Sequence, residues 1–386
     1  MIQRGIATFT LDYGRCPPWL FRRMTNLGRE MIRAIVALDG PDEFIKRIAD
    51  PVWFQSLGTV LAFDWNASGL TTTLTAALKE AIRGEERNLG FFICGGKGKT
   101  SRKAPEQIVE GSEKFNFSES LTKKLVYNSK MAAKVDSSLV QAGFQIYHHA
   151  FFFTKSGAWT VIQQGMNIEK QSARRYHWHS GNVKDLVCEP HTGIVSDVRI
   201  NKPLNMTALE SEKARDLSTE LVSQNFLSLM KDIKILRKYS APHSRMAKIA
   251  AKNGQLTLLD LDASEFHWHP VVNEDFSKSK YLEKILWELC DRKPENYEKL
   301  LAMKGVGPKT IRALALVAEL IYGAKPSYED PARYSFALGG KDATPFPVDR
   351  PTYDKTIQLM KEYVRKARIP ISEKERAIVS LNKTLK

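Results

Sequence analysis

Two glycines, two lysines and a proline are closely spaced within residues 300–310, which read Leu-Leu-Ala-Met-Lys-Gly-Val-Gly-Pro-Lys-Thr. Pro308 suits the first turn of a helix, and Gly305 and Gly307 permit a tight turn before it. Such a turn exposes backbone N–H groups beside a helix N-terminus, where an anion is stabilised without any base being read. The segment therefore predicts a helix-hairpin-helix at residues 297–318 that binds a nucleic-acid backbone. Its contacting residues would be Lys304, Gly305, Val306, Gly307 and Thr310.

An ordinary pair of helices with glycine at its turn is the alternative interpretation. Leu300 before the turn, and Ile311 and Leu314 after it, have the spacing of side chains that pack two helices together. The Lys-Thr pair that follows Pro308 adds positive charge at the turn. These features together favour backbone binding over a purely structural hairpin.

Polar side chains also gather on a second pair of segments. Residues 145–153 and 159–164 are rich in aromatic and β-branched types and predict a strand hairpin. Because alternate residues of a strand share a face, we expect His148 and Gln164 to converge beside Asp136. An acid, an imidazole and an amide could hold Mg²⁺ or Mn²⁺ for phosphodiester hydrolysis. The alternative is a histidine pair divided between the core and the solvent.

A short apolar strand at residues 91–94 leads into Gly-Gly-Lys-Gly-Lys-Thr, which contains Lys97 and Lys99. A nucleotide-binding P-loop would need another glycine where this chain has Ile93. Ile93 belongs to the strand and cannot wrap a phosphate. The loop is therefore interpreted as a flexible basic segment in which Lys97 and Lys99 contact DNA phosphates.

Arg174, Arg175 and Tyr176 place two cations beside an aromatic ring. Guanidinium groups bind phosphates, and an aromatic ring can stack on an unpaired or flipped base. These three residues are therefore further candidates for DNA binding. A solvated basic face with a packed tyrosine is an equally good interpretation.

Histidines and cysteines are the side chains of this sequence that could bind zinc. The tripeptide His-Trp-His occurs at residues 177–179 and again at 267–269, and residues i and i+2 of a strand point the same way. Chance repetition or tryptophan anchors explain the pair without a metal. The cysteines, Cys16, Cys94, Cys188 and Cys290, are scattered without a Cys-x-x-Cys pair, so we expect reduced thiols and no structural zinc.

The elements that must position these residues predict an α+β protein with two domains. Residues 1–203 would form an α/β domain with a small sheet, including helices at 19–38 and 70–82. Residues 204–386 would form an all-α domain that contains the hairpin. Its first helix would begin at a capping box made by Thr207 and Glu210 and run to about Ile235.

The composition favours a polyanionic partner. The chain has 386 residues, a formal charge of +15 and a pI near 9.5. It shows neither the apolar run of a signal peptide nor the roughly 20 apolar residues of a membrane span. We therefore expect a cytoplasmic, nucleoid-associated protein with no membrane partner.

The hairpin motif, followed downstream by Phe-Pro-Val-Asp at residues 346–349, resembles the helix-hairpin-helix/Gly-Pro/Asp superfamily of DNA glycosylases. That superfamily includes the endonuclease III and 8-oxoguanine glycosylase types. The resemblance assigns the nucleophile of the bifunctional members to Lys309 and the catalytic carboxylate to Asp349. This chain departs from the pattern because residues 327–344 are inserted between the two positions, and no iron–sulfur cysteine cluster is present.

The resemblance implies a glycosylase-like helical fold and a base excision repair activity. A damaged base in double-stranded DNA, oxidised or deaminated, would be flipped out and removed, and an AP lyase step would nick the strand. A desolvated amine attacks the sugar C1′ to form a Schiff base, so no cofactor is required. The non-catalytic alternative for Lys309 is a phosphate contact, and that for Asp349 is a helix cap.

Over its length the chain also resembles a widespread family of archaeal and thermophile proteins that carries a domain-of-unknown-function label. The matching segments are residues 94–99, 147–149, 163–167, 173–178 and 339–342. This resemblance transfers no chemistry. Two functions therefore stay open beside DNA repair: a metal-dependent DNA endonuclease with an N-terminal active site, and a DNA-binding protein without enzymatic activity.

Overall fold

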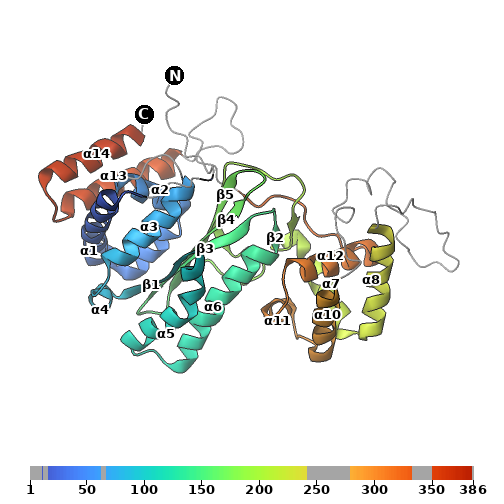
Figure 1. The fold of residues 1–386 in the computed structure, drawn as a ribbon. Coiled ribbons are helices and arrows are strands. Elements are labelled where there is room, and N and C mark those ends of the chain that lie inside the picture. The colour runs from blue at the N-terminus through green and yellow to red at the C-terminus, as the bar shows by residue number, and fades with distance from the viewer. Residues whose placement is uncertain (1–10, 12–15, 62–66, 241–278, 333–349, 385–386) are drawn as a thin grey trace, which may run out of the picture.

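The computed structural model describes residues 11, 16–61, 67–240, 279–332 and 350–384. A small antiparallel sheet lies at its centre, with helices on both faces and a further helical group to one side (Figure 1). This arrangement confirms the predicted mixture of helices with a small sheet. Among the described helices, none is both long enough and apolar enough to cross a bilayer.

The sheet has the strand order β1-β3-β4-β5-β6, and every neighbouring pair is antiparallel. The predicted hairpin is the pair β3–β4, joined at Gly157, whose positive φ of 84° suits the turn. A separate two-stranded ladder joins β2 to β7. The strands are β1 (Phe91–Lys97), β2 (Val140–Gln141), β3 (Gln145–Thr154), β4 (Trp159–Asn167), β5 (Ser172–His179), β6 (His191–Ser196) and β7 (Leu204–Asn205).

Five longer helices and the short α4 (Glu86–Leu89) pack around one face of the sheet. The longer helices are α1 (Pro18–Ile48), α2 (Pro51–Val60), α3 (Ala67–Ala81), α13 (Arg350–Lys366) and α14 (Ile371–Thr384). The range of α1 contains two helical segments, because Gly40, with φ 83° and ψ 167°, leaves helical geometry just before Pro41 and close to the predicted end at residue 38. The sheet contributes Phe91, Ile93 and Phe152 to this core.

The predicted domain boundary assigned α13 and α14 to the second domain, whereas they pack on α1 and α2. Met360 and Val364 are buried in the same core as the N-terminal helices, and Tyr363 hydrogen-bonds to Asp39. The guanidinium group of Arg47 lies over the Tyr363 ring. An apolar stripe shows which face a helix buries but does not identify the partner, so chain order alone misplaced these helices.

The opposite face of the sheet is covered by η1 (Gly98–Lys103), α5 (Ala104–Lys114) and α6 (Glu119–Ser138). Ser118 caps α6 by accepting a hydrogen bond from the Leu121 N–H at 3.2 Å. Phe151 and Phe153 of β3 point to this side, while Phe152 between them points to the other. Alternation along β3 therefore supplies both cores.

The helical group packs beyond α6. It consists of η2 (Leu209–Ser211), α7 (Glu212–Ser223), α8 (Phe226–Ser240), α10 (Lys280–Arg292), α11 (Tyr297–Ala302) and α12 (Pro308–Tyr322). The single helix predicted from Thr207 is instead two, because the chain leaves helical geometry at Gln224. The Thr207 hydroxyl donates to Asn205 at 2.7 Å and does not cap a helix. Buried side chains of this group continue without a break into the α5–α6 side of the sheet.

Gly95 and Gly98 provide a matched test of this packing. Both have positive φ, +79° and +58°, but a Cβ at Gly95 would lie 2.1 Å from the His149 carbonyl oxygen, whereas one at Gly98 meets nothing within 4 Å. We expect Gly98→Ala to lower the free energy of unfolding by about 1 kcal/mol, the cost of left-handed backbone. Gly95→Ala should lower it by roughly 3 kcal/mol or more, because β1 must also shift from β3. Urea denaturation measures both, and equal losses would contradict the clash.

Candidate functional site

The glycine-rich turn joins α11 to α12, the two helices of the predicted hairpin. Asn296 caps α11 by accepting from the Lys299 N–H at 2.9 Å, and α12 begins at Pro308. Gly305 has a φ of +91°, and an added Cβ would lie 2.3 Å from Ile285 of α10. Gly305 is therefore required both for the turn and for its contact with α10.

The outer surface of the turn is open. Lys304, Pro308 and Lys309 are exposed, and a Cβ added at Gly307 would meet nothing within 4 Å. No side chain caps the N-terminus of α12, so the N–H groups of its first turn point to this surface. A phosphate could approach the backbone at Gly307 without steric hindrance.

Val306 and Thr310 were also predicted as DNA contacts, but their side chains are 4% and 3% exposed. Both point into the helical core and shape the turn from the inside. Only their backbone could face a phosphate. This part of the prediction is corrected because the apolar side of a tight turn must be buried to hold it.

The hairpin is anchored to α6 by a contact that sequence reasoning missed. The Lys134 ammonium group donates to the carbonyl oxygens of Leu301 at 2.6 Å and Met303 at 2.5 Å, where α11 ends. Partial burial lowers the pKa of Lys134 to about 8. On the other side of the turn, the Gln141 amide donates to the Pro308 carbonyl at 2.9 Å. The turn is therefore held at both ends, by Lys134 of α6 and by Gln141 of β2.

A row of polar residues crosses four adjacent strands on the face below α3. Lys97 pairs with His148, His148 with Gln164, and Gln164 with Arg175. Residues opposite one another in a sheet share a face, so these four side chains line up across it. We call them the α3-side row. Each comes from one of the segments that resemble the unknown-function family.

Hydroxyl groups of α3 contact this row. The Thr75 hydroxyl lies 3.1 Å from His148 Nε2 and 2.8 Å from the Thr71 carbonyl. The Gln164 amide donates to the Ser68 carbonyl at 2.9 Å and to Tyr147. Burial, with His149 and Lys97 nearby, lowers the pKa of His148 to about 3. Within the described residues, His148 Nδ1 has no hydrogen-bond partner.

Arg174, Arg175 and Tyr176 are completely buried, so the predicted DNA contacts at these residues are wrong for this conformation. Arg174 pairs with Asp330 at 2.7 Å, and Arg175 donates to His177 Nε2 at 2.8 Å. Burial lowers the pKa of Arg175 to about 9. The interior strand β5 is buried along its whole length, a circumstance that a basic tripeptide does not reveal.

A second polar group lies on the α6 side of the sheet. The Asp136 carboxylate accepts from His191 at 2.5 Å, from Trp178 at 3.0 Å and from Gln163. Gln163 in turn contacts His149 Nδ1 at 2.9 Å. We call Asp136, Gln163, His149, His191 and Trp178 the α6-side network.

The predicted group of Asp136, His148 and Gln164 does not form. His148 and Gln164 face α3, whereas Asp136 on the opposite face accepts from Gln163, which in turn contacts His149. A shift of one residue along a strand changes the face, so the choice between adjacent histidines decided the outcome. His191, which sequence analysis did not select, completes the network because β6 lies beside β5.

Other predicted ligands and contacts are placed as follows. Lys97 and Lys99 are exposed, and Lys97 lies 5.9 Å from the centre of the Tyr147 ring. No cluster suited to a metal ion is found among the described side chains. Asp349, residues 267–269 and residues 339–342 lie outside the described part of the chain.

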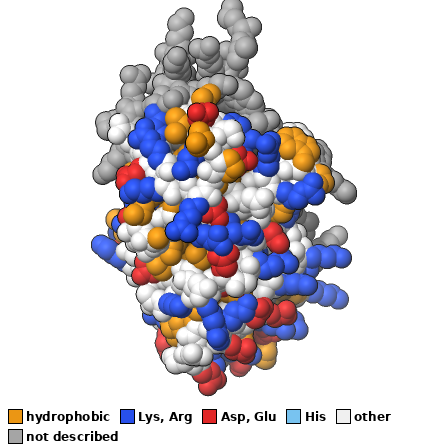
Figure 2. Space-filling view, turned by 90° about the vertical axis from the view of Figure 1, so that its left-hand side faces the viewer, with side chains coloured by type: hydrophobic (Ala, Val, Ile, Leu, Met, Phe, Trp, Pro, Cys, Tyr) orange, Lys and Arg blue, Asp and Glu red, His pale blue; other side chains and the backbone are white. Residues whose placement is uncertain are grey.

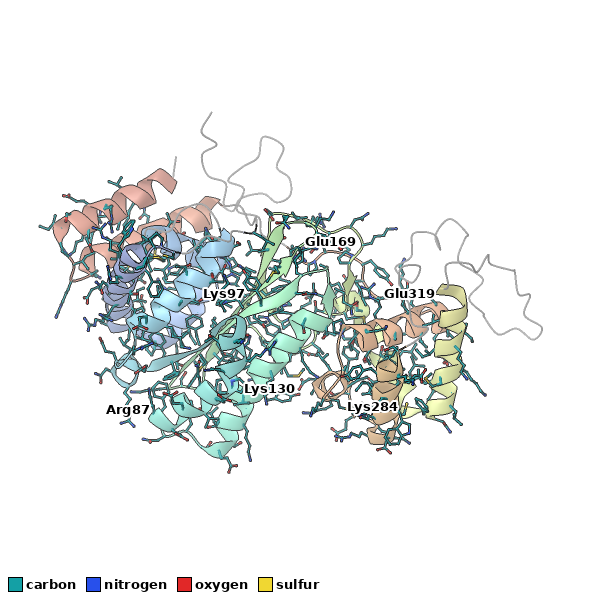
Figure 3. The ribbon with its side chains drawn as sticks, in the orientation of Figure 1. Arg87, Lys97, Lys130, Glu169, Lys284 and Glu319 are labelled. Atoms are coloured by element: carbon teal, nitrogen blue, oxygen red, sulfur yellow. The ribbon has the colours of Figure 1, made fainter. Side chains whose placement is uncertain are left out.

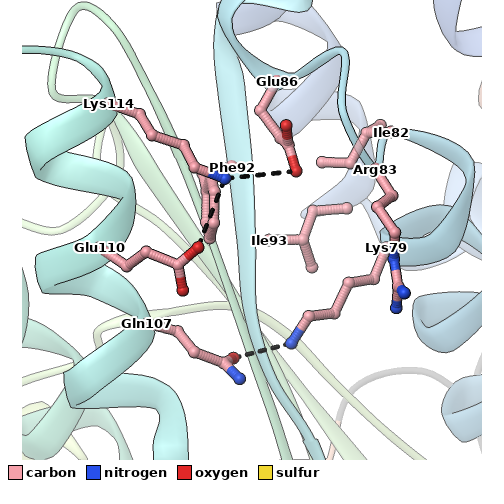
Figure 4. Close-up of a pocket in the computed structure, with 9 residues that line it drawn as sticks. All are labelled: Lys79, Ile82, Arg83, Glu86, Phe92, Ile93, Gln107, Glu110 and Lys114. Atoms are coloured by element: carbon pink, nitrogen blue, oxygen red, sulfur yellow. Dashed lines mark hydrogen bonds and ion pairs between the residues drawn. The ribbon is translucent and has the colours of Figure 1, made fainter.

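A cleft of about 200 Å³ runs along the outer edge of β1 (Figure 4). Lys79 reaches across it, donating to the Gly95 carbonyl at 2.9 Å and to Gln107 at 2.7 Å, and burial lowers its pKa. Gln107 accepts from the Gly95 N–H at 2.8 Å. Charged and amide side chains therefore occupy the free edge of the sheet, which protects it from pairing with another strand.

The buried histidines predict acid sensitivity. In an unfolded chain they protonate near pH 6.5, whereas folded His148 stays neutral to about pH 3. The unfolded state therefore binds more protons in this window, and the free energy of unfolding should fall as the pH drops below 6.5. The slope is about 1.4 kcal/mol per pH unit for each such histidine. Urea titrations between pH 4 and 7 should show a smaller slope for His148→Gln; an unchanged slope would contradict the neutral, buried imidazole.

One known protein family matches most of this chain. Residues 5–348 match the family described as "Protein of unknown function (DUF763)". No curated protein matches the chain, and no solved structure matches it. The match spans the sheet, both polar groups and the hairpin. The chain therefore belongs to this family of proteins of unknown function.

Proposed function

We propose that this protein binds the sugar–phosphate backbone of double-stranded DNA through the α11–α12 hairpin. The observation that carries the proposal is the open backbone at Gly307, beside exposed Lys304 and Lys309 and the uncapped N-terminus of α12. Phosphate contacts of this kind fix position and register without reading bases. The hairpin is thus suited to hold any duplex sequence.

The charge of the whole chain supports the same partner. A formal charge of +15 attracts polyanions over the whole surface. On the face shown in Figure 2, however, lysines and arginines are intermixed with acidic and apolar side chains. Net charge thus promotes association, while the hairpin supplies the specific backbone geometry.

The more specific activity that we propose is removal of a damaged base followed by strand cleavage. Its support is the resemblance of the hairpin and of residues 346–349 to DNA glycosylases, with Lys309 as the nucleophile and Asp349 as the carboxylate. The Lys309 amine would form a bond to C1′ as the bond to the base breaks, and the base would leave with the electron pair and take up a proton. The product of this attack would be an aminal, which becomes a Schiff base when the C1′–O4′ bond breaks, the nitrogen loses a proton and O4′ takes one up. Loss of a proton from C2′ would then expel the 3′ phosphate by β-elimination.

A metal-dependent nuclease centred on Asp136 lacks the ligand group that the sequence predicted for it. Asp136 is separated by the sheet from His148 and Gln164, and its oxygens already accept from His191, Trp178 and Gln163. DNA binding without catalysis is the outcome expected if no covalent intermediate forms.

Gly307→Ala separates DNA binding from folding. Gly307 has an extended φ of −151°, and the added methyl group meets no protein atom within 4 Å. We expect less than about 1 kcal/mol of destabilisation, but a roughly tenfold or greater loss of duplex affinity, because the methyl group stands where a phosphate approaches. Fluorescence anisotropy with a labelled duplex measures the affinity. Affinity equal to that of the unchanged protein would exclude the hairpin as the grip.

Borohydride trapping tests the catalytic part. The full chain is incubated in EDTA with duplexes that each carry one oxidised base, deaminated base or abasic site, and borohydride is added. We expect a covalent protein–DNA adduct with at least one lesion, and its loss in Lys309→Ala. Lys304→Ala is the control, since it removes an exposed lysine of the same turn but should leave trapping detectable. Cleavage that appears only with Mg²⁺ or Mn²⁺ would contradict the lyase proposal.

A further inference from the structure

The hairpin meets α6 along a seam that carries positive charge. On α6, Tyr127 donates its hydroxyl to Glu298 of α11 at 2.5 Å, and Lys134 donates to the carbonyls where α11 ends. The Lys299 ammonium group lies 5.0 Å from the centre of the Tyr127 ring. We call this contact line the α6–α11 seam.

Lys130 lies between the two α6 residues that make these contacts. Tyr127, Lys130 and Lys134 are three and four residues apart, a spacing that places them on one face of a helix. Lys134 is half-buried and uses its protons on backbone carbonyls, whereas Lys130 and Lys299 are exposed. Figure 3 shows Lys130 on α6, on the side of the sheet where the helical group docks.

The seam joins the open surface of the hairpin. Met303, whose carbonyl Lys134 contacts, directly precedes the exposed Lys304. Lys130 is one helical turn from Lys134, a rise of about 6 Å, and successive phosphates of one strand advance about 3.4 Å along the duplex axis. A strand held at the hairpin would therefore bring its next phosphates alongside α6.

The charge balance of the seam fits a polyanion. Its one acidic residue, Glu298, accepts the hydrogen bond from Tyr127. Lys130 and Lys299 come from different elements, so the chain places two exposed cations beside the hairpin by tertiary contact. An exposed lysine is usually only solvated. Here a DNA strand bound at the neighbouring hairpin would bring phosphates to the two lysines.

We propose that the α6–α11 seam extends the DNA grip, with Lys130 and Lys299 contacting backbone phosphates of the strand that the hairpin holds. This inference rests on the proposed DNA binding by the hairpin. It assigns to α6 a part in DNA binding, in addition to its packing on the sheet. The ligand is the sugar–phosphate backbone, so no base preference is expected from the seam.

The salt dependence of duplex binding tests this surface. Each phosphate that a cation neutralises contributes a slope of about −0.9 to log K against log salt. We expect Lys130→Ala to reduce the magnitude of the slope by about one and to weaken binding equally for all duplex sequences. The matched control is Lys46→Ala, which removes an exposed lysine of α1 on the opposite face of the sheet and should leave the slope unchanged. Lys299→Ala should act like Lys130→Ala.

The outcomes distinguish this inference from the function on which it rests. If Lys130→Ala behaves like Lys46→Ala while Gly307→Ala still weakens binding, the seam is excluded and the hairpin stands. If the unchanged protein binds no duplex at low salt, the proposed function fails and the inference fails with it. Thermal denaturation of each variant verifies that the fold is retained, and Lys130→Arg should restore the slope if charge is what matters.

Discussion

The buried carboxylate of Asp136 joins α6 to the sheet, and α6 in turn positions the hairpin proposed to bind DNA. It lies on α6 and accepts hydrogen bonds from Gln163 of β4, Trp178 of β5 and His191 of β6. A buried carboxylate is stable only when its oxygens are satisfied, so this network sets the position of α6 on the sheet. Two residues earlier, Lys134 fastens the same helix to the end of α11. The position of the hairpin therefore depends on the network in the sheet.

The two polar groups on the sheet have the same physical origin. Adjacent residues of β3 and β4 point to opposite faces, so His148 with Gln164 lies below α3 while His149 with Gln163 lies below α6. Buried polar side chains are costly unless they are paired, and the two helices supply partners: the Thr75 hydroxyl of α3, and the Ser129 hydroxyl and Asp136 carboxylate of α6. Polar layers on both faces also fix the register of the sheet, because a slip of one residue would exchange the two sets of partners.

The hairpin combines a rigid base with an open surface. Gly305, Val306 and Thr310 serve the packing on its inner side, and Gly307 with the two lysines forms its outer side. The docking on α6 leaves that outer side open and adds cations next to it. A binding loop that is supported in this way loses little conformational entropy when it meets its ligand. The proposed activity thus rests on a preformed surface with a fixed orientation toward the sheet.

The sequence by itself determined the features that depend on neighbouring residues. The turn at residues 303–307, the start of α12 at Pro308 and the β3–β4 hairpin follow from the local requirements of glycine, proline and alternating aromatic side chains. Tertiary structure alone decided that His191 meets Asp136, that Arg174 and Arg175 are buried, and that α13 and α14 return to α1 and α2. These outcomes depend on contacts between segments far apart in the chain. Local spacing describes a face, but only packing decides what that face meets.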